Sequence, residues 1–114
     1  MLTKDQILAS LDIAKEEVQV PEWGGSVFVR GMTGLERDAF GTSLRNPDGS
    51  VNLDSYRAKL LVCCVVDEQG NALFTPADAA ALNGKSSLAL DRVFKVAERL
   101  NSLGNDALDA AEKN

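Results

Sequence analysis

The chain has 114 residues, of which 12 are lysine or arginine, 17 are aspartate or glutamate and none is histidine, giving a formal net charge of −5. This length fits one domain. Without histidine, the chain has no Ser-His-Asp or Cys-His catalysis and no metal site that uses imidazole. The acidic balance argues against binding to a nucleic-acid backbone, which needs a basic face. Composition therefore favours a protein that works by contact rather than by catalysis.

The two cysteines, Cys63 and Cys64, are adjacent within the apolar run Leu60–Val66. Neighbouring residues of a helix or strand point in different directions, so we expect two free thiols in a core rather than a disulfide. No C-x-x-C pair is present, and we predict no metal site and no cofactor. The polar, acidic start is unlike a signal peptide, and no apolar run approaches the roughly 20 residues of a membrane helix. These features predict a reducing, cytosolic setting without membrane contact.

The first predicted element is a short helix. Thr3 and Gln6 form a T-x-x-Q capping box, and Ile7, Leu8 and Leu11 follow it. Short isolated helices are unstable in water, so we expect this one to pack on something larger.

A β-hairpin is predicted next. Glu17–Val20 and Val27–Arg30 alternate apolar and polar residues on either side of Gly24-Gly25. Phe28 and Arg30 are expected to point to the outer face. The inner face is expected to carry the valines Val18, Val20, Val27 and Val29.

Two helices are predicted after the hairpin. Thr33 and Glu36 form a second capping box, and Asn46–Gly49 ends that helix with a turn. Asn52 is expected to cap the next helix. Leu60–Val66 favours a buried helix, although a strand-turn-strand that turns at residues 67–71 remains open. The expected apolar stripes are Leu35, Ala39, Phe40 and Leu44 on the first helix, and Tyr56, Leu60, Cys63 and Cys64 on the second.

Two further helices follow. Thr75-Pro76-Ala77-Asp78 is a strong helix start, and Gly84 ends that helix. Ser86 or Ser87 caps the last long helix, which Gly104 closes. Its expected stripe is Leu90, Val93, Phe94, Ala97 and Leu100. The predicted fold is α+β and mostly α-helical: a small single domain over residues 1–104, with an N-terminal β-hairpin followed by about four helices, and a polar C-terminal tail over residues 105–114.

Motifs that carry chemistry are weak. Asp67–Asn71 lacks the ligand spacing of a calcium loop, and the acid clusters lie where a helix dipole favours them. No serine stands in a G-x-S-x-G or S-x-x-K motif. We predict no catalytic residue. A small hydrolase that uses carboxylates would instead show a deep pocket with strongly perturbed acids.

Four residues are candidates for partner contact. Trp23 is the only tryptophan, and tryptophan is enriched at binding hot spots, although it also covers small cores well. Phe28 and Arg30 share the outer strand face and either pack under helices or form a docking surface. Phe94 belongs to the stripe of the last helix, part of which the core can leave uncovered.

The ordered set of motifs carries a resemblance. Residues 20–40 read V-P-E-W-G-G-S-V-F-V-R-G-M-T-G-L-E-R-D-A-F. This segment resembles the opening of tailed-phage (siphovirus-type) tail assembly chaperones, which commonly reads V-P-E-W-G-G-x-V-x-V-R-x-L-T-G-x-E-R-D. Residues 66–74, with Asp78, Leu82 and Ser86-Ser87, are similar to a second block of that family, and residues 99–103 to its usual ending. Met32 stands where leucine is commoner, a mild exchange.

The resemblance implies a non-enzymatic role in building a phage tail. Members of this family bind the tape measure protein, a long and largely helical hydrophobic chain. They keep it soluble and help recruit tail tube subunits in the host bacterial cytoplasm, and they are absent from the mature virion. The alternative is a generic protein-interaction module or a minor structural subunit of a phage particle. The sequence leaves self-association open.

The resemblance also implies two lengths of product, because many members are extended by a programmed ribosomal frameshift. Glu112-Lys113-Asn114 can be encoded GAA-AAA-AAC, which contains the slippery heptamer A-AAA-AAC. We therefore expect this chain to be the short form of a frameshifted pair, with the tail tube protein recruited through the longer form.

Overall fold

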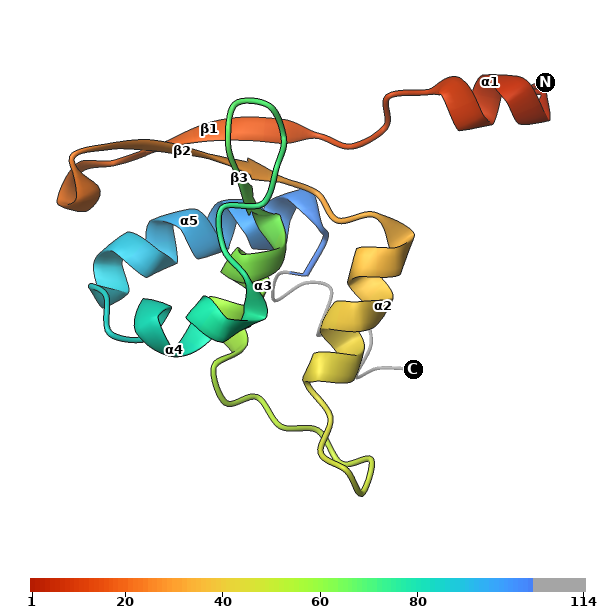
Figure 1. The fold of residues 1–114 in the computed structure, drawn as a ribbon. Helices are drawn as coiled ribbons and strands as arrows, with labels where there is room; N and C mark the ends of the chain where they lie inside the picture. Colours follow the sequence, from red (N-terminus) through yellow and green to blue (C-terminus); the bar gives the residue numbers. More distant parts are fainter. Residues whose placement is uncertain (104–114) are drawn as a thin grey trace.

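The computed structural model describes residues 1–103, and Figure 1 shows their arrangement. A small sheet lies over a layer of helices, and one short helix stands apart from both (Figure 1). In chain order the elements are α1 (Lys4–Ala9), β1 (Lys15–Val20), the 3₁₀ turn η1 (Pro21–Trp23), β2 (Gly25–Arg30), α2 (Gly34–Ser43), α3 (Tyr56–Cys64), β3 (Val65–Val66), the 3₁₀ turn η2 (Pro76–Asp78), α4 (Ala79–Leu82) and α5 (Ser87–Leu100).

The predicted hairpin is confirmed. β1 and β2 pair antiparallel, with Val18 opposite Val27, and the turn between them passes through η1 and Gly24. Gly24 has φ 75° and ψ 21°, a left-handed conformation that glycine adopts without a steric penalty. The inner valines face the helices, with Val18, Val20 and Val29 buried and Val27 half-buried.

The helices pack against one face of the sheet and enclose the core. α5 crosses beneath β1 and β2 and also packs on α3 (Figure 1). The predicted α5 stripe is confirmed, since Leu90, Val93, Phe94 and Ala97 are buried and Leu100 is half-buried. The rest of the core comes from the inner valines and from the buried side chains Phe40, Ala58, Leu60, Leu61, Cys64, Val65, Leu82 and Ala89.

The ambiguous segment Leu60–Val66 forms both kinds of structure. The favoured helix continues to Cys64, and Val65–Val66 then form β3, which pairs with Val29 and Phe28 of β2. A turn follows, and Val66 bridges to Ala72. The helix prediction is therefore right for α3 and wrong for the last two residues, because the free edge of β2 offers them backbone partners.

Two expectations about α2 and α3 are wrong. Asn52 does not cap α3, which begins at Tyr56 with Ser55 in the N-cap position. The side-chain oxygen of Asn52 instead accepts a hydrogen bond from the Asp54 N–H at 2.8 Å, which forms a local turn. On α2, Leu35 is 81% exposed and Ala39 is also exposed, because only the side of α2 that carries Phe40 meets the core.

The first helix is capped as predicted, since Thr3 and Gln6 make both hydrogen bonds of the capping box. The sequence predicted that this helix packs on something larger; within the described structure no residue of α1 is buried. The four helices α2–α5 follow the hairpin, as predicted. The predicted closure at Gly104, the domain boundary there and the polar tail 105–114 lie outside the described residues.

Candidate functional site

The outer face of the hairpin carries two predicted contact residues, Phe28 and Arg30. Phe28 is half-buried, and the Lys15 ammonium lies 4.8 Å from the centre of its ring. Lys15 Nζ also donates a hydrogen bond to the Glu68 carbonyl at 3.2 Å, which ties β1 to the turn after β3. Phe28 pairs across the sheet with Val66, which is buried. Part of this outer face is therefore already covered by the chain itself.

Arg30 links the end of the hairpin to the start of α2. Its guanidinium lies 2.6 Å from a carboxylate oxygen of Glu36 and also donates to the Gly31 carbonyl at 3.0 Å. Burial raises the pKa of Glu36, but the hydrogen bonds from Arg30 and the Thr33 N–H outweigh it, so the pKa lies below its ordinary value. Within residues 1–103, the buried Nε of Arg30 has no hydrogen-bond partner. The charge of Arg30 is nevertheless paired inside the fold, because Glu36 contacts its guanidinium.

Trp23 lies at the far end of the hairpin in η1. Its side chain is half-buried and packs against the core cluster. The adjacent Glu22 forms an ion pair with Arg92 of α5 at 3.1 Å, which holds the hairpin end against that helix. Trp23 therefore contributes to the core and presents part of its ring to solvent.

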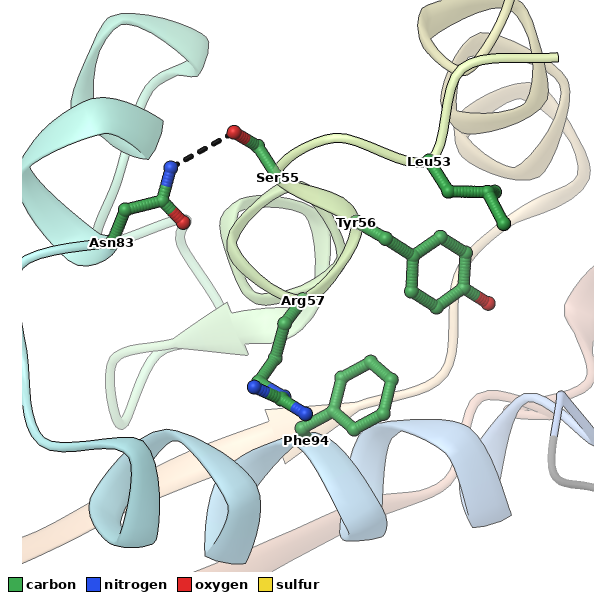
Figure 2. A pocket seen from close by; sticks show the side chains of 6 residues that line it. All are labelled: Leu53, Ser55, Tyr56, Arg57, Asn83 and Phe94. Atoms are coloured by element: carbon green, nitrogen blue, oxygen red, sulfur yellow. Dashed lines mark hydrogen bonds between the residues drawn. The ribbon is translucent and has the colours of Figure 1, made fainter.

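Phe94 lines a pocket between α3 and α5, shown in Figure 2. Tyr56 packs edge-on against the Phe94 ring, with 5.7 Å between the two ring centres. The Arg57 guanidinium carbon lies 5.3 Å from the centre of the Phe94 ring. Phe94 itself is 9% exposed. The pocket has a volume of about 300 Å³, and its lining residues in the described chain are Leu53, Ser55, Tyr56, Arg57, Asn83 and Phe94, without a carboxylate.

The structure does not bring the four predicted contact residues into one site. Phe28 and Arg30 share the outer sheet face, Trp23 lies at the hairpin end, and Phe94 lies on the core side of α5. Their roles in partner binding stay predictions.

The sequence interpretation missed an exposed apolar segment at the N-terminus. Ile7, Leu8 and Leu11 are 54%, 76% and 102% exposed. The sequence contains the signal, because Ile7 and Leu8 lie in a short capped helix that has too few apolar residues to build a core of its own, and Leu11 lies just after it.

It also missed an apolar groove of about 210 Å³ between α2, α3 and the η2–α4 segment. This groove joins residues that are distant in the sequence, so no local pattern marks it. Its lining includes Phe40 of α2 and Val62 and Cys63 of α3.

The described part of the chain, residues 1–103, contains neither a candidate metal-ion cluster nor a helix that could cross a membrane. No three acidic or cysteine side chains in this part of the chain lie close enough to hold a metal ion. None of its helices has the length and apolar character that crossing a membrane requires.

The fold and the family are defined by comparison with known proteins. A small α+β domain of this kind occurs in the solved structure of the tail assembly chaperone of bacteriophage HK97, which is similar with a TM-score of 0.61 and 16% sequence identity. The similarity covers 89% of this chain and 95% of the HK97 chain. A family model described as phage tail assembly chaperone matches residues 3–113, so the chain belongs to the phage tail assembly chaperone family. A search of curated proteins found no match.

Proposed function

We propose that this chain binds the tape measure protein of its phage and keeps it soluble while the tail is built. The observation that carries the proposal is the family match over residues 3–113. The structure supports it with exposed apolar side chains on α1 and an apolar groove beside α2, since binding to a helical apolar client requires apolar surface. The net charge of −5 favours solubility of the loaded complex.

The proposed role is non-enzymatic and needs no cofactor, metal, nucleic acid or membrane. Family membership supports this, because a chaperone acts by binding and release. The proposal places the chain in the host bacterial cytoplasm during assembly and excludes it from the mature virion.

The proposal includes recruitment of tail tube subunits through a longer frameshifted form. Its support is family membership, together with the codons that Glu112-Lys113-Asn114 permits. The nucleotide sequence tests this directly: A-AAA-AAC at these codons supports the frameshift, and an AAG lysine codon there contradicts it.

Co-expression with the neighbouring long tape measure gene tests the main proposal. We expect soluble tape measure protein only when this chain is present, with the two proteins co-purifying. An unrelated acidic protein of similar size serves as the control for expression load. Equal solubility without the chain would contradict the proposal, and persistence of the chain in purified virions would favour a structural subunit instead.

Two variants of one strand test the predicted outer-face contact. Phe28 and Ser26 lie on the same strand and, two residues apart, on the same face of the sheet. We expect Phe28→Ala to reduce co-purification of the tape measure protein, and Ser26→Ala to leave it unchanged. Equal co-purification with both variants would remove Phe28 from the contact surface.

A further inference from the structure

The pocket between α3 and α5 is a second concave surface, separate from the apolar groove beside α2. Its walls come from the loop before α3, the first turn of α3, the residue after α4 and the middle of α5 (Figure 2). In the described chain the pocket and the groove have no lining residue in common. A site in this pocket is therefore distinct from the surfaces proposed above for the tape measure protein.

Aromatic rings form a fixed wall of the pocket. Tyr56 packs between Phe40 and Phe94, with its ring centre 5.5 Å from the first and 5.7 Å from the second. Leu53 also lines the pocket and is 63% exposed. Covering this leucine with an apolar group is favourable in water. The pocket therefore offers apolar surface to one aliphatic side chain of a ligand.

Arg57 supplies a positive charge beside this wall. Its guanidinium carbon lies over the Phe94 ring, which holds it at the pocket. The acid that it contacts in the described chain is Asp91, at a long 3.8 Å, and Asp91 lies closer to Lys95, at 3.2 Å. A guanidinium has five N–H donors in a fork that matches both oxygens of a carboxylate. Arg57 therefore retains donors for a second carboxylate.

Ser55 and Asn83 add polar groups to the pocket. Asn83 Nδ2 donates a hydrogen bond to Ser55 Oγ at 2.8 Å, which joins the end of α4 to the start of α3 (Figure 2). The Ser55 hydroxyl accepts this bond and keeps its own proton as a donor. The side-chain oxygen of Asn83 is an acceptor, which suits the N–H of a peptide backbone.

The volume and the charge of the pocket together define its ligand. About 300 Å³ is at the small end of the range for ligand pockets, so the pocket fits one or two side chains of a partner. The described lining has one formal charge, that of Arg57, and no carboxylate. This is a locally positive site on a chain with a net charge of −5. A basic ligand would be repelled by Arg57, and an acidic one is attracted.

We propose that the α3–α5 pocket binds an acidic peptide segment of a partner protein, in which an aliphatic side chain stands next to a glutamate or aspartate. The aliphatic side chain covers Leu53 and the aromatic wall, and the carboxylate pairs with Arg57. A backbone N–H of the segment donates to the side-chain oxygen of Asn83. The carboxylate contact is a charge-assisted hydrogen bond, which is stronger than a neutral one.

Two short peptides test the proposal on the full, isotope-labelled chain. The probes are acetyl-leucyl-glutamyl amide and acetyl-leucyl-glutaminyl amide, which have nearly the same shape and differ in charge. NMR titrations follow the amide signals of the protein. We expect the acidic peptide to shift the backbone amides of Ser55 and Arg57 and the side-chain amide of Asn83. The neutral peptide should bind at least about fivefold more weakly, because it lacks the charge-assisted contact.

Arg57→Gln and its matched control Arg99→Gln locate the charge that matters. Both arginines are partly exposed, at 46% and 60%, but Arg99 pairs with Glu16 and lies outside the pocket lining. We expect Arg57→Gln to bind the two peptides equally, and Arg99→Gln to keep the preference for the acidic one. The amide spectrum of each variant shows whether it is folded.

Leu53→Ala and Leu88→Ala test the aliphatic part of the contact. The two leucines are similarly exposed, at 63% and 69%, and in the described structure Leu53 lines the pocket while Leu88 does not. We expect Leu53→Ala to weaken binding of both peptides by about threefold, because apolar contact area is lost. Leu88→Ala should leave both affinities unchanged.

Four results would overturn the proposal. Two of them concern the unmodified chain: equal affinity for the two peptides, or no shift of the named amides at about 10 mM acidic peptide. The third is a set of shifted amides that lies at the groove between α2 and α3. The fourth is an Arg99→Gln variant that loses the preference as fully as Arg57→Gln. The tape measure protein takes no part in these measurements, so either proposal can fail without the other.

Discussion

The Glu36 side chain makes two kinds of contact, one that caps α2 and one that joins α2 to the hairpin. Glu36 closes the capping box of α2 with Thr33 and also pairs with Arg30 of the hairpin. Arg30 is 18% exposed and Glu36 is 33% exposed, so the pair is screened by water less than an ordinary surface pair. The pair thereby fixes α2 relative to the sheet, which in turn positions one wall of the groove.

We predict that Glu36→Gln lowers the free energy of unfolding by about 1 kcal/mol at neutral pH, because glutamine keeps the cap but loses the charge. The pKa of Glu36 is lowered in the fold. Its ionisation therefore stabilises above its ordinary pKa of 4.5, and this stability is lost as the pH falls through the folded-state pKa. Urea titrations from pH 7 to pH 3 should show the two proteins converging at acid pH.

The control for this prediction is Glu16→Gln. Glu16 pairs with Arg99, and both side chains are more exposed than those of the first pair, at 43% and 60%. We expect a change below about 0.5 kcal/mol. If the free energies of unfolding of Glu36→Gln and the unmodified chain differed by the same amount at pH 7 and at pH 3, the assigned role of the charge would be contradicted.

The hairpin and α5 supply much of the core, and each depends on a local feature. The hairpin turns back through η1 because Gly24 adopts a left-handed conformation. α5 buries one stripe against the sheet and leaves Leu88 outside. Each element also offers a matched control. Gly25 is a glycine next to Gly24 but lies in extended β2, and Leu88 is a leucine of α5 like Leu90 but is exposed.

We predict that Gly24→Ala destabilises the protein by about 1–2 kcal/mol, because a Cβ is unfavourable in the left-handed region. Gly25→Ala should have an effect near zero, because Gly25 lies in extended β2 and an added Cβ there meets no atom within 4 Å. Chemical denaturation of both variants measures the difference. Equal effects would show that the turn does not depend on the conformation of Gly24.

We predict that Leu90→Ala lowers the free energy of unfolding by about 2–5 kcal/mol, since Leu90 is 5% exposed and its loss leaves a cavity. Leu88→Ala, on the same helix and 69% exposed, should change it by less than about 0.5 kcal/mol. Thermal or urea unfolding tests both. A large loss with Leu88→Ala would mean that this side of α5 is covered in solution.

At the scale of the whole molecule, the core is complete without residues 1–14, here called the arm. The sheet and the helices α2–α5 supply all its buried residues among residues 1–103, and α1 supplies none. The α1 part of the arm therefore presents its aliphatic side chains to solvent and adds nothing to the core.

We predict that a chain beginning at Asp12 keeps its free energy of unfolding within about 0.5 kcal/mol, because no packed side chain is removed. The measurement is urea unfolding at low protein concentration, where association contributes little. Leu60→Ala, which truncates a fully buried side chain, is the destabilised control. A loss comparable to that control would show that the arm packs on its own domain.

Patterns confined to a few neighbouring residues predicted much of the fold. The capping boxes at Thr3 and Thr33, the hairpin and the α5 stripe are each defined by contacts within one or two elements. The expected Asn52 cap is wrong because α3 begins only at Tyr56, and the side-chain oxygen of Asn52 accepts a hydrogen bond from the Asp54 N–H in the turn before it. The candidate contact residues were found by type and position, but their separation in space was invisible in the sequence.

The sequence by itself determined the capping boxes at Thr3 and Thr33, the inner face of the hairpin and the family resemblance, because these depend on hydrogen bonds and alternation between near neighbours. The tertiary structure decided where α3 ends, since Val65 and Val66 became a strand only beside the edge of β2. It also decided that Leu35 and the arm stay exposed and that α2 and α3 enclose a groove. Burial and grooves are properties of segments that are distant along the chain, so only their packing determines them.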